Sequence, residues 1–343
     1  MKILLFADLH MCPRSSIISK WGNKYPIRLE NCIKSVNWLE QLAVEQKCEY
    51  IINLGDFFDK PDLNSETITA CNDINWSDIM HYSLVGNHDA SIRSLLFNSV
   101  NSLQKDRHRI IQEPLVLPLD DCFICFLPYI VECDRRPLSE YFPKLRTSDK
   151  PVIILSHNDI SGIQLGPVMS RTGFSIEEIE QNCDLFINGH LHNGQSLTSK
   201  VINLGNLTGK DFGEDATKYT HNIAILDTKT LQIDFIENPY AYNFYKVQIN
   251  AKEDLQLLNN LKNQAVVSIK CDDLLLEQTK EYIKNLGTKI LEHRIIVIKN
   301  YVEASETAEV NLTIDYLEKF IECCKANIDC TILLEEELGE ICK

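Results

Sequence analysis

The sequence lacks the long apolar run that a membrane-spanning helix requires. None of its 343 residues belongs to a run approaching the ~18 consecutive apolar residues that cross a bilayer. The apolar run at residues 2–7 is too short for a secretion signal and ends at Asp8. Hydrophobic residues make up 44% of the chain and charged residues 24%, as in ordinary globular proteins. We therefore expect a cytoplasmic protein without a membrane partner.

The sequence also lacks the paired cysteines of a zinc-binding or disulfide-rich domain. Its 13 cysteines are an odd number in a chain without a secretion signal, which predicts reduced thiols. Cys122 and Cys125 form the only CxxC motif, and no second pair lies at zinc-site spacing, so we expect no structural zinc ion there. A group near the C-terminus, best interpreted as buried thiols on a helix, comprises Cys323, Cys324, Cys330 and Cys342.

Positive charge is in short supply. The chain has 34 Lys and Arg against 49 Asp and Glu, so its net charge is −15. Because nucleic-acid binding is driven largely by neutralising phosphates, this balance at first argues against a nucleic-acid enzyme. The distribution of the cations along the chain, described below, weakens that argument.

What the sequence does contain is a set of five short segments rich in histidine, carboxylate and asparagine. Five of the nine histidines fall inside them. Neutral imidazole together with carboxylate suits Mn, Fe or Zn, whereas an all-oxygen set suits Mg or Ca. The segments cover residues 8–10, 55–59, 86–89, 156–158 and 189–192.

Each segment follows an apolar run that is typical of a buried strand. Asp8 and His10 are two residues apart, so an extended backbone directs both side chains to one face, and the same spacing separates His190 from His192. Catalytic sites of α/β folds lie at the carboxyl ends of strands. The expected strands cover residues 2–7, 50–54, 81–85, 152–156 and 184–188.

Each segment alone has an ordinary explanation. An Asp-x-His pair occurs by chance, a lone histidine near a strand end is commonly a hydrogen-bonded surface residue, and Gly-Asn-His-Asp can form a turn. Five such segments in order, each after a strand-like run, are not expected by chance. The sequence therefore predicts an α/β fold with a metal site at its strand ends.

The order D-x-H, G-D-x-x-D, G-N-H-D, H, G-H-x-H resembles that of the calcineurin-like metallophosphoesterase superfamily. The resemblance implies an α/β fold, a β-sandwich flanked by helices, with two divalent metal ions at the strand ends. Mn²⁺ is the expected metal, with Mg²⁺ or Fe²⁺ as alternatives. Carried over by position, one ion would be held by Asp8, His10, Asp56 and His192. The other would be held by Asp56, Asn87, His157 and His190, with Asp56 bridging.

The resemblance also assigns two residues to catalysis. His88 would be the general acid that protonates the leaving oxygen, and Asp89 would orient its ring. Two metal ions about 4 Å apart can clamp a phosphate and activate water. A neutral amide at Asn87 keeps the site from becoming too anionic to accept that phosphate.

Within the superfamily the chain is similar to the SbcD-type subunit of bacterial and phage recombination nucleases. Protein Ser/Thr phosphatases are disfavoured, because Lys60 and Pro61 follow the second motif and Asp89 follows His88. The Gly-Asp-Phe-Phe-Asp form of the second motif and the Asp-Phe-Gly-Glu stretch at residues 211–214 are typical of the nuclease branch. This likeness implies DNA as substrate, an SMC-like ATPase of the SbcC type as partner, a possible homodimer, and a bacterial or phage-infected cytoplasm.

One stretch of the chain concentrates positive charge. Between Met11 and Leu29 there are four cations, no acid and two interleaved aromatic residues: Arg14, Lys20, Trp21, Lys24, Tyr25 and Arg28. The stretch directly follows the first metal motif, so we hypothesise that it contacts a DNA backbone and stacks a base. An ordinary solvated loop explains the charge pattern equally well.

Pattern and resemblance together predict three parts. Residues 1–239 form the catalytic domain, ending after a hairpin centred on residues 228–230. Residues 240–305 form a small α/β capping domain with strands near 244–249, 265–270 and 295–298 and a helix from Leu274 that ends at Gly287. Residues 306–343 contain helices that would dock on the ATPase; packing on the cap is the alternative.

The predicted function is that of a Mn²⁺-dependent phosphodiesterase, a DNA endo- or exonuclease subunit in recombination, repair or replication. Two other functions stay open. One is a phosphodiesterase for small substrates such as cyclic nucleotides, which would show no preference for DNA. The other is a non-catalytic adaptor subunit of an SMC-type ATPase, although every ligand of the motifs is present.

Overall fold

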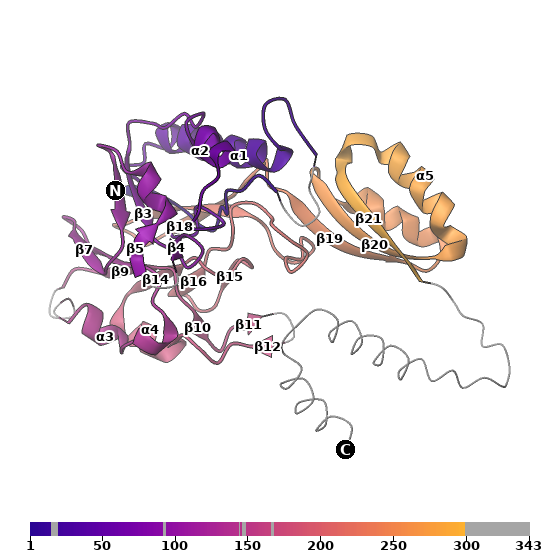
Figure 1. Ribbon diagram of the computed structural model, residues 1–343. Helices are drawn as coiled ribbons and strands as arrows, with labels where there is room; N and C mark the ends of the chain where they lie inside the picture. Colours follow the sequence, from indigo (N-terminus) through magenta and orange to yellow (C-terminus); the bar gives the residue numbers. More distant parts are fainter. Residues whose placement is uncertain (15–19, 92–93, 144, 146–148, 166–167, 299–343) are drawn as a thin grey trace, which may run out of the picture. The chain divides into compact units, whose positions relative to one another are not determined.

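The computed structural model of the chain describes residues 1–14, 20–91, 94–143, 145, 149–165 and 168–298 (Figure 1). The predicted C-terminal helical segment at residues 306–343, with its four cysteines, lies outside the described residues, as does the end of the predicted capping domain. In the part of the chain that the structure describes, no helix is both long and apolar enough to cross a bilayer.

Two six-stranded mixed sheets form the predicted catalytic domain, with orders β18-β17-β1-β2-β3-β6 and β15-β16-β14-β9-β8-β7. The strands of the first sheet are β1 (Lys2–Phe6), β2 (Tyr50–Asn53), β3 (Met80–Leu84), β6 (His108–Ile111), β17 (Asn222–Asp227) and β18 (Ile233–Glu237). Those of the second are β7 (Leu115–Pro118), β8 (Phe123–Leu127), β9 (Val152–Ser156), β14 (Leu185–Asn188), β15 (Gln195–Ser196) and β16 (Val201–Asn203). All five strands predicted to precede the metal motifs are confirmed.

The sheets pack face to face, and helices cover their outer faces. Ile3 and Leu5 of β1 lie in a cluster with Phe126 of β8 between the sheets, whereas Leu4 and Phe6 lie in a cluster on the other face of β1 with the helix α1. Because β1 is buried on both faces, its sequence is continuously apolar instead of alternating. This arrangement confirms the predicted α/β fold with a β-sandwich flanked by helices.

The alternation of side chains along a strand also explains why the two cysteines of the CxxC motif lie in different clusters. Cys122 lies in the cluster between the sheets, and Cys125 lies in the cluster on the outer face of the second sheet. Successive side chains of a strand point to opposite faces, and residues three apart do so as well. The two thiols therefore cannot share a zinc ion, as the sequence predicted.

Five helices are described: α1 (Ile27–Glu45), α2 (Ser65–Cys71), α3 (Leu138–Tyr141), α4 (Ile176–Asn182) and α5 (Leu276–Leu286). In α1, Leu29, Cys32, Val36 and Leu39 recur at helical spacing and are fully buried against the first sheet. This apolar face serves the core, and the predicted homodimer stays a prediction. Helices α3 and α4 contribute Leu138 and Ile179 to the outer cluster of the second sheet.

Three short strand pairs lie in the connections of the sandwich. They are β4 (Ala90–Ser91) with β5 (Ser94–Asn98), β10 (Ile160–Ser161) with β13 (Phe174–Ser175), and β11 (Gln164–Leu165) with β12 (Val168–Met169). The first pair directly follows the Gly-Asn-His-Asp segment, so its position bears on the site.

A separate three-stranded parallel sheet follows the sandwich, with order β19-β20-β21. Its strands are β19 (Asn243–Ile249), β20 (Ala265–Asp272) and β21 (Ile290–Ile298), and α5 lies between β20 and β21 in the chain and packs beside them (Figure 1). Helix α5 ends at Gly287, which has φ 59°, a conformation that favours glycine. The strands and the helix agree with the sequence prediction, while a capping role for this sheet stays a prediction.

A buried imidazole pair outside the metal motifs makes the stability pH-dependent. His81 and His108 stack with their ring centroids 5.1 Å apart, His81 Nε2 lies 2.7 Å from Glu40 Oε1, and the Ser83 hydroxyl lies 2.9 Å from His108 Nε2. Burial, with His81 and Lys105 nearby, lowers the pKa of His108 to about 3 from its usual 6.5. His108 is therefore neutral in the folded protein at pH values where the unfolded chain already binds a proton.

We expect the free energy of unfolding to fall by about 1 kcal/mol per pH unit from this group as pH drops from about 6.5 towards 3. The stabilising contribution is complete above the unfolded pKa and is lost on acidification. Urea unfolding of the protein in EDTA between pH 7 and 4 measures it. His108→Gln should flatten the slope, and an unchanged slope in that variant would contradict the assignment.

Candidate metal centre

The five predicted segments meet at one edge of the sandwich. Asp8, Asp56 and Asn87 follow β1, β2 and β3 of the first sheet, and His157 and His190 follow β9 and β14 of the second. In each sheet these strands are parallel neighbours, so their carboxyl ends lie side by side. Each sheet therefore supplies part of one constellation.

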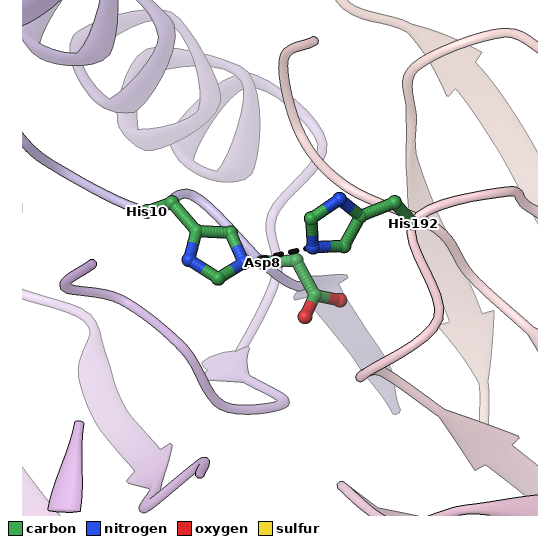
Figure 2. A group of neighbouring side chains, drawn as sticks. All are labelled: Asp8, His10 and His192. Atoms are coloured by element: carbon green, nitrogen blue, oxygen red, sulfur yellow. Dashed lines mark hydrogen bonds between the residues drawn. The ribbon is translucent and has the colours of Figure 1, made fainter. Parts of the chain in front are cut away.

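The first group of side chains is formed by Asp8, His10 and His192, whose ligand atoms lie within 4.8 Å of one another. Figure 2 shows the two imidazole rings pointing toward each other with the carboxylate beside them. His10 Nε2 and His192 Nε2 are 2.9 Å apart. The Asp8 carboxylate accepts hydrogen bonds at 3.0 and 3.1 Å from the backbone N–H of His190, which ties the two sheets together here.

The second group is formed by Asp56, His157 and His190, again within 4.8 Å. Asn87 Oδ1 lies 3.2 Å from His157 Nε2 and 2.9 Å from His190 Nδ1. Asp56 Oδ2 lies 3.3 Å from His157 Nε2 and 3.7 Å from His10 Nε2, so one carboxylate reaches both groups. This is the position that a bridging ligand needs.

The hydrogen bonds behind the rings fix where their lone pairs point. His157 Nδ1 lies 2.8 Å from the carbonyl oxygen of Leu54, and His192 Nδ1 lies 2.8 Å from Glu214 Oε1. Because carbonyl and carboxylate oxygens only accept, both Nδ1 atoms donate, and in the neutral rings each Nε2 carries a lone pair. The lone pair of His157 Nε2 faces Asp56 Oδ2 and Asn87 Oδ1, two oxygens that only accept, and that of His192 Nε2 faces His10 Nε2.

The pKa shifts of the histidines in the two groups also indicate that the site stabilises cations. Burial lowers the pKa of His10 to about 3, so that its ring is neutral. Burial also opposes charge on His157, but Asp56 and the neighbouring carboxylates outweigh it and raise the pKa of His157 to about 9. A cluster that draws in a proton against the cost of burial is one in which a cation is stabilised. The donor set therefore fits two divalent ions, which, when bound, polarise a phosphoryl oxygen and activate water.

The backbone at the ligands is strained. Asp8, His10, Asp56 and His190 all have positive φ, at 52°, 46°, 51° and 75°. Non-glycine residues rarely adopt this region, and such residues cluster at functional sites that the surrounding fold stabilises. Here the support comes from backbone hydrogen bonds between the first two loops, from Asp8 to Gly55 and from His10 to Asp56.

Comparison with known proteins names the family. The sequence model of the Calcineurin-like phosphoesterase family matches residues 1–194, more than half of the chain. The chain belongs to the calcineurin-like phosphoesterase family. It is therefore a metallophosphoesterase, a hydrolase whose relatives use two divalent metal ions, and it carries the corresponding side-chain clusters.

Solved structures with a similar arrangement include a dimetal phosphatase from Danio rerio, at 13% identity, which covers 69% of this chain and 98% of its own with a TM-score of 0.40. The TT1561 protein of Thermus thermophilus has 11% identity, the same coverage and a TM-score of 0.40. A nuclease, MPE of Pseudomonas putida, has 19% identity, covers 50% of this chain and 72% of its own, and has a TM-score of 0.23. A search of curated protein sequences finds no match.

Two glycines of this phosphoesterase let its loops approach each other. A Cβ atom on Gly55 would lie 2.3 Å from His157 Nδ1, and one on Gly86 would lie 2.1 Å from Asp56 Oδ1. Gly55 also has φ 112°. Any side chain at these positions would displace a predicted ligand.

The catalytic pair differs from its predicted arrangement. His88 Nδ1 lies 3.1 Å from the carbonyl oxygen of Asp59, which leaves Nε2 free to face the site. The Asp89 carboxylate accepts instead from the backbone N–H groups of Phe58, at 2.9 Å, and Gly86, at 3.0 Å. The prediction that Asp89 orients the His88 ring is therefore wrong, because the backbone turn directs that carboxylate into the protein, where it joins the second and third loops.

Two of the predicted DNA contacts are also wrong. Arg28 is 1% exposed and donates to the carbonyl oxygens of Leu9 and Gly209, both at 3.0 Å, so it holds the loop between two metal ligands. Tyr25 is 6% exposed, and its hydroxyl donates to Asp73 at 2.9 Å. Neither side chain can reach a DNA strand.

The other four residues of the basic stretch are exposed. Lys24 forms an ion pair with Asp73 at 2.6 Å, and Lys20 forms one with Glu292 of β21 at 3.3 Å. Trp21 is 62% exposed, and Arg14 is exposed as well. These four stay candidates for DNA contacts.

Sequence reasoning missed the carboxylates that stand behind the ligands. Glu214 is buried; it binds His192 Nδ1, and its Oε1 also accepts from Asn206 at 2.8 Å. Asp159 Oδ1 lies 3.2 Å from His190 Nε2. Partners of this kind fix ring orientation at metal sites. The sequence did single out the Asp-Phe-Gly-Glu stretch that contains Glu214, as a feature of the nuclease branch. It could not show that the Glu214 carboxylate contacts His192.

An ion pair at the edge of the site was missed as well. Lys210 Nζ lies 2.6 Å from Asp59 Oδ1 and 3.3 Å from His10 Nδ1. The backbone N–H of Lys210 donates to the second oxygen of Glu214 at 2.8 Å, so this loop supports both His10 and His192. Lys210 is partly exposed and places a cation beside the predicted metal ions.

Replacing Glu214 by glutamine should weaken Mn²⁺ binding by about 10- to 100-fold. The amide can still contact His192, but it removes the charge that keeps Nδ1 protonated and Nε2 available. Isothermal titration of the metal-free protein with Mn²⁺ measures the effect. Asp215→Asn is the matched control, because the side chain of that partly exposed neighbour contacts Thr217 and Lys218 and no predicted ligand. Equal affinities of the two variants would contradict the role.

Proposed function

We propose that this phosphoesterase is a Mn²⁺-dependent phosphodiesterase that cleaves DNA, a nuclease subunit of the SbcD type acting in recombination, repair or replication in the cytoplasm. The observation that supports it best is a run of three adjoining cavities whose lining includes the predicted ligand Asn87 and the predicted general acid His88. A phosphodiester within a polymer continues on both sides of the reacting phosphate, so it needs such a run.

The central cavity has a volume of about 600 Å³ and is lined by His88, Asn87 and Lys210 among others. It shares Asn87, Ala90 and Ser91 with a neighbour of about 540 Å³. On the other side it shares Asp59 and Lys60 with a cavity of about 380 Å³. A cyclic nucleotide or a phosphomonoester would fill the central cavity alone, which disfavours the small-substrate alternative.

Cations lie along this run, although four acids line it as well: Asp59, Asp62, Glu66 and Asp134. Arg14 lines the smallest cavity, Lys60 lines that cavity and the central one, and Lys210 lines the central one. Three cations and two divalent ions in one run suit a strand with a phosphate at every nucleotide. The net charge of −15 belongs to the whole chain, whereas binding confined to this run depends on the charges and metal ions that line it.

The side chains divide the chemical work. His88 Nδ1 donates to the Asp59 carbonyl in either protonation state of the ring. When the ring is the imidazolium, Nε2 can give its proton to the leaving oxygen as a general acid, and the ring becomes neutral. Asn87 presents a neutral oxygen to His157 and His190 and adds no negative charge where a phosphate must bind. Manganese is proposed because imidazole and carboxylate are mixed in the donor set, with Mg²⁺ and Fe²⁺ as alternatives.

A partner completes the proposal. Residues 306–343 carry apolar residues at helical spacing and would dock on the coiled-coil base of an SMC-like ATPase of the SbcC type. A chain ending at residue 305 should then lose the ATPase in a pull-down while keeping metal-dependent phosphodiesterase activity. Intact ATPase binding by the shortened chain would reject this role, and a second copy of the chain is a further partner to test by its mass in solution.

The test of the function is degradation of end-labelled single- and double-stranded DNA by the purified protein with Mn²⁺, Mg²⁺ or EDTA. Cleavage that requires Mn²⁺ is expected. Hydrolysis of a cyclic nucleotide with no cleavage of DNA would favour the small-substrate enzyme. No hydrolysis of either substrate, with or without the ATPase, would favour the adaptor.

A further inference from the structure

We propose that the cavity of about 540 Å³ beside Asn87 is a nucleobase site, which holds the base of the nucleotide next to the reacting phosphate. The inference deepens the proposed function and rests on it. The described residues that line the cavity are Asn87, Ala90, Ser91, Ser94, Leu95, Tyr129, Ile130, Val131, Cys133 and Asp134.

The lining matches the chemistry of a base. A nucleobase has flat apolar faces and a polar edge, and it stacks on aromatic or aliphatic side chains. Here Tyr129, Leu95 and Val131 supply apolar surface, while Ser91 and Ser94 supply hydroxyl groups. The volume lies in the usual range for small-molecule sites.

Charge decides which part of a nucleotide belongs in this cavity. Its described lining contains no Lys or Arg, and Asp134 is an acid at its border. A second phosphate would be repelled there, whereas a neutral base would not. The central cavity, which holds Lys60 and Lys210, is the part that suits phosphates.

The position of the cavity places a base within reach of the metal ligands. Asn87 lines both this cavity and the central one. The Tyr129 ring centroid lies 5.9 Å from that of His190, a predicted ligand of the second ion. A base in this cavity and a phosphate in the central one would therefore both contact Asn87.

The wall that carries Tyr129 is held in place by both sheets. The Tyr129 backbone N–H donates to the carbonyl oxygen of Val85 at 3.0 Å, next to β3. The N–H of Ile130 donates to Asn158 Oδ1 at 2.9 Å, next to β9. The backbone that carries Tyr129 is thus fixed before any substrate binds, which lowers the cost of binding a base.

The opposite wall is the strand pair β4 and β5. This pair begins at Ala90, directly after the Gly-Asn-His-Asp segment, and carries Leu95 into the cavity lining. Beyond Leu95, Leu96 is 62% exposed and Phe97 is 73% exposed. Phe97 is two residues beyond Leu95 on β5 and so lies on the same face, where it extends the surface on which a further base could stack. Leu96 points to the other face and lines a different cavity with Ile111 and Leu115.

The test compares two esters that share the 4-nitrophenolate leaving group: thymidine 5′-(4-nitrophenyl phosphate), which carries a base, and methyl 4-nitrophenyl phosphate, which does not. The wild-type protein should prefer the nucleotide in kcat/KM. Tyr129→Leu and Leu95→Ser should reduce that preference about ten-fold, mainly through KM for the nucleotide. Any general effect of these variants on the metal site cancels in the ratio of the two substrates. Leu115→Ser, an exposed apolar residue on β7, should leave the preference unchanged.

A binding measurement accompanies the kinetics. The fluorescence of 2-aminopurine riboside 5′-monophosphate, measured with Mg²⁺, should be quenched by the wild-type protein and not by Tyr129→Leu, because stacking causes the quenching. A preference that survives both substitutions, or quenching that survives Tyr129→Leu, would overturn the base site. If neither ester is hydrolysed, the fluorescence decides.

The outcomes separate this inference from the proposed function. Cleavage of DNA with a preference insensitive to Tyr129 and Leu95 would retain the nuclease and reject the base site. A base-dependent preference without DNA cleavage would retain the base site and reject the nuclease.

Discussion

Replacing Asp56 by alanine is expected to abolish metal binding and phosphoesterase activity together. Asp56 is the carboxylate that reaches both groups of ligands, with Oδ2 3.3 Å from His157 Nε2 and 3.7 Å from His10 Nε2. Its other oxygen accepts from the backbone N–H of His88 at 2.8 Å. One substitution therefore removes a ligand from each predicted ion and a support of the third loop.

The charge of Asp56 explains why the loss should be large. Burial alone would raise the pKa of this carboxyl, but His157 and His10 outweigh burial and hold it far below the usual value. The carboxylate is therefore ionised under all ordinary conditions and supplies negative charge where two cations must lie close together. We expect Mn²⁺ affinity to fall by more than about 100-fold, beyond the loss caused by removing an outer partner of a ligand.

The Asp56→Asn variant distinguishes the effect of the negative charge from the effect of the side chain's size and shape. The amide keeps the acceptor for His88 but removes the negative charge, so it should lose metal nearly as completely as alanine. Titration with Mn²⁺, with circular dichroism to verify folding, measures both variants. Asp120→Asn, an exposed residue between β7 and β8, is the control, and retained Mn²⁺ binding in Asp56→Asn would disprove the bridging role.

His88→Ala should have the opposite profile: both metal ions retained and most turnover lost. A positioned general acid contributes about 10²- to 10⁴-fold, and DNA cleavage expels an alkoxide that needs a proton. The His88 ring is held by the Asp59 carbonyl and lies at the border of the central cavity. His88 also lies with His10 and Asp56 in a third group of potential ligand atoms, so retention of both ions in the variant is what distinguishes a general acid from a ligand.

The leaving group provides the sharper measurement. 4-Nitrophenolate departs without a proton, so His88→Ala should slow hydrolysis of a 4-nitrophenyl ester far less than cleavage of DNA. Rates on both substrates with Mn²⁺, and Mn²⁺ affinity for the same preparations, decide the role. Equal losses on the two substrates, or loss of bound Mn²⁺, would show that His88 is a ligand or a structural residue.

The parts of the site that the sequence predicted are those specified locally. A continuous apolar run followed by Gly, Asp or His marks a doubly buried strand and the loop after it, and five repeats of that pattern located all seven predicted ligands. The structure brings Asp8, His10 and His192 together although 182 residues separate the two histidines. The order of the motifs predicted this long-range grouping, because it resembles the order in a known family.

The parts that the sequence did not predict depend on contacts between distant segments. Arg28 occurs among other cations and looks like a surface residue, but its acceptors are backbone carbonyls at Leu9 and Gly209. Every residue has a backbone carbonyl, so the sequence does not show which carbonyl oxygens accept from Arg28. Asp89 was misassigned for a related reason: adjacency to His88 in the chain does not determine where a carboxylate points after a turn.

The bridged two-metal centre is tested most directly by the manganese content and electron paramagnetic resonance spectrum of the reconstituted protein. We expect two Mn²⁺ ions per chain with the spectrum of an exchange-coupled pair, because Asp56 reaches both groups of ligands. In Asp56→Asn we expect uncoupled or absent ions. One ion per chain, or two ions without coupling in the wild-type protein, would contradict the bridged two-metal centre on which the proposed DNA cleavage depends.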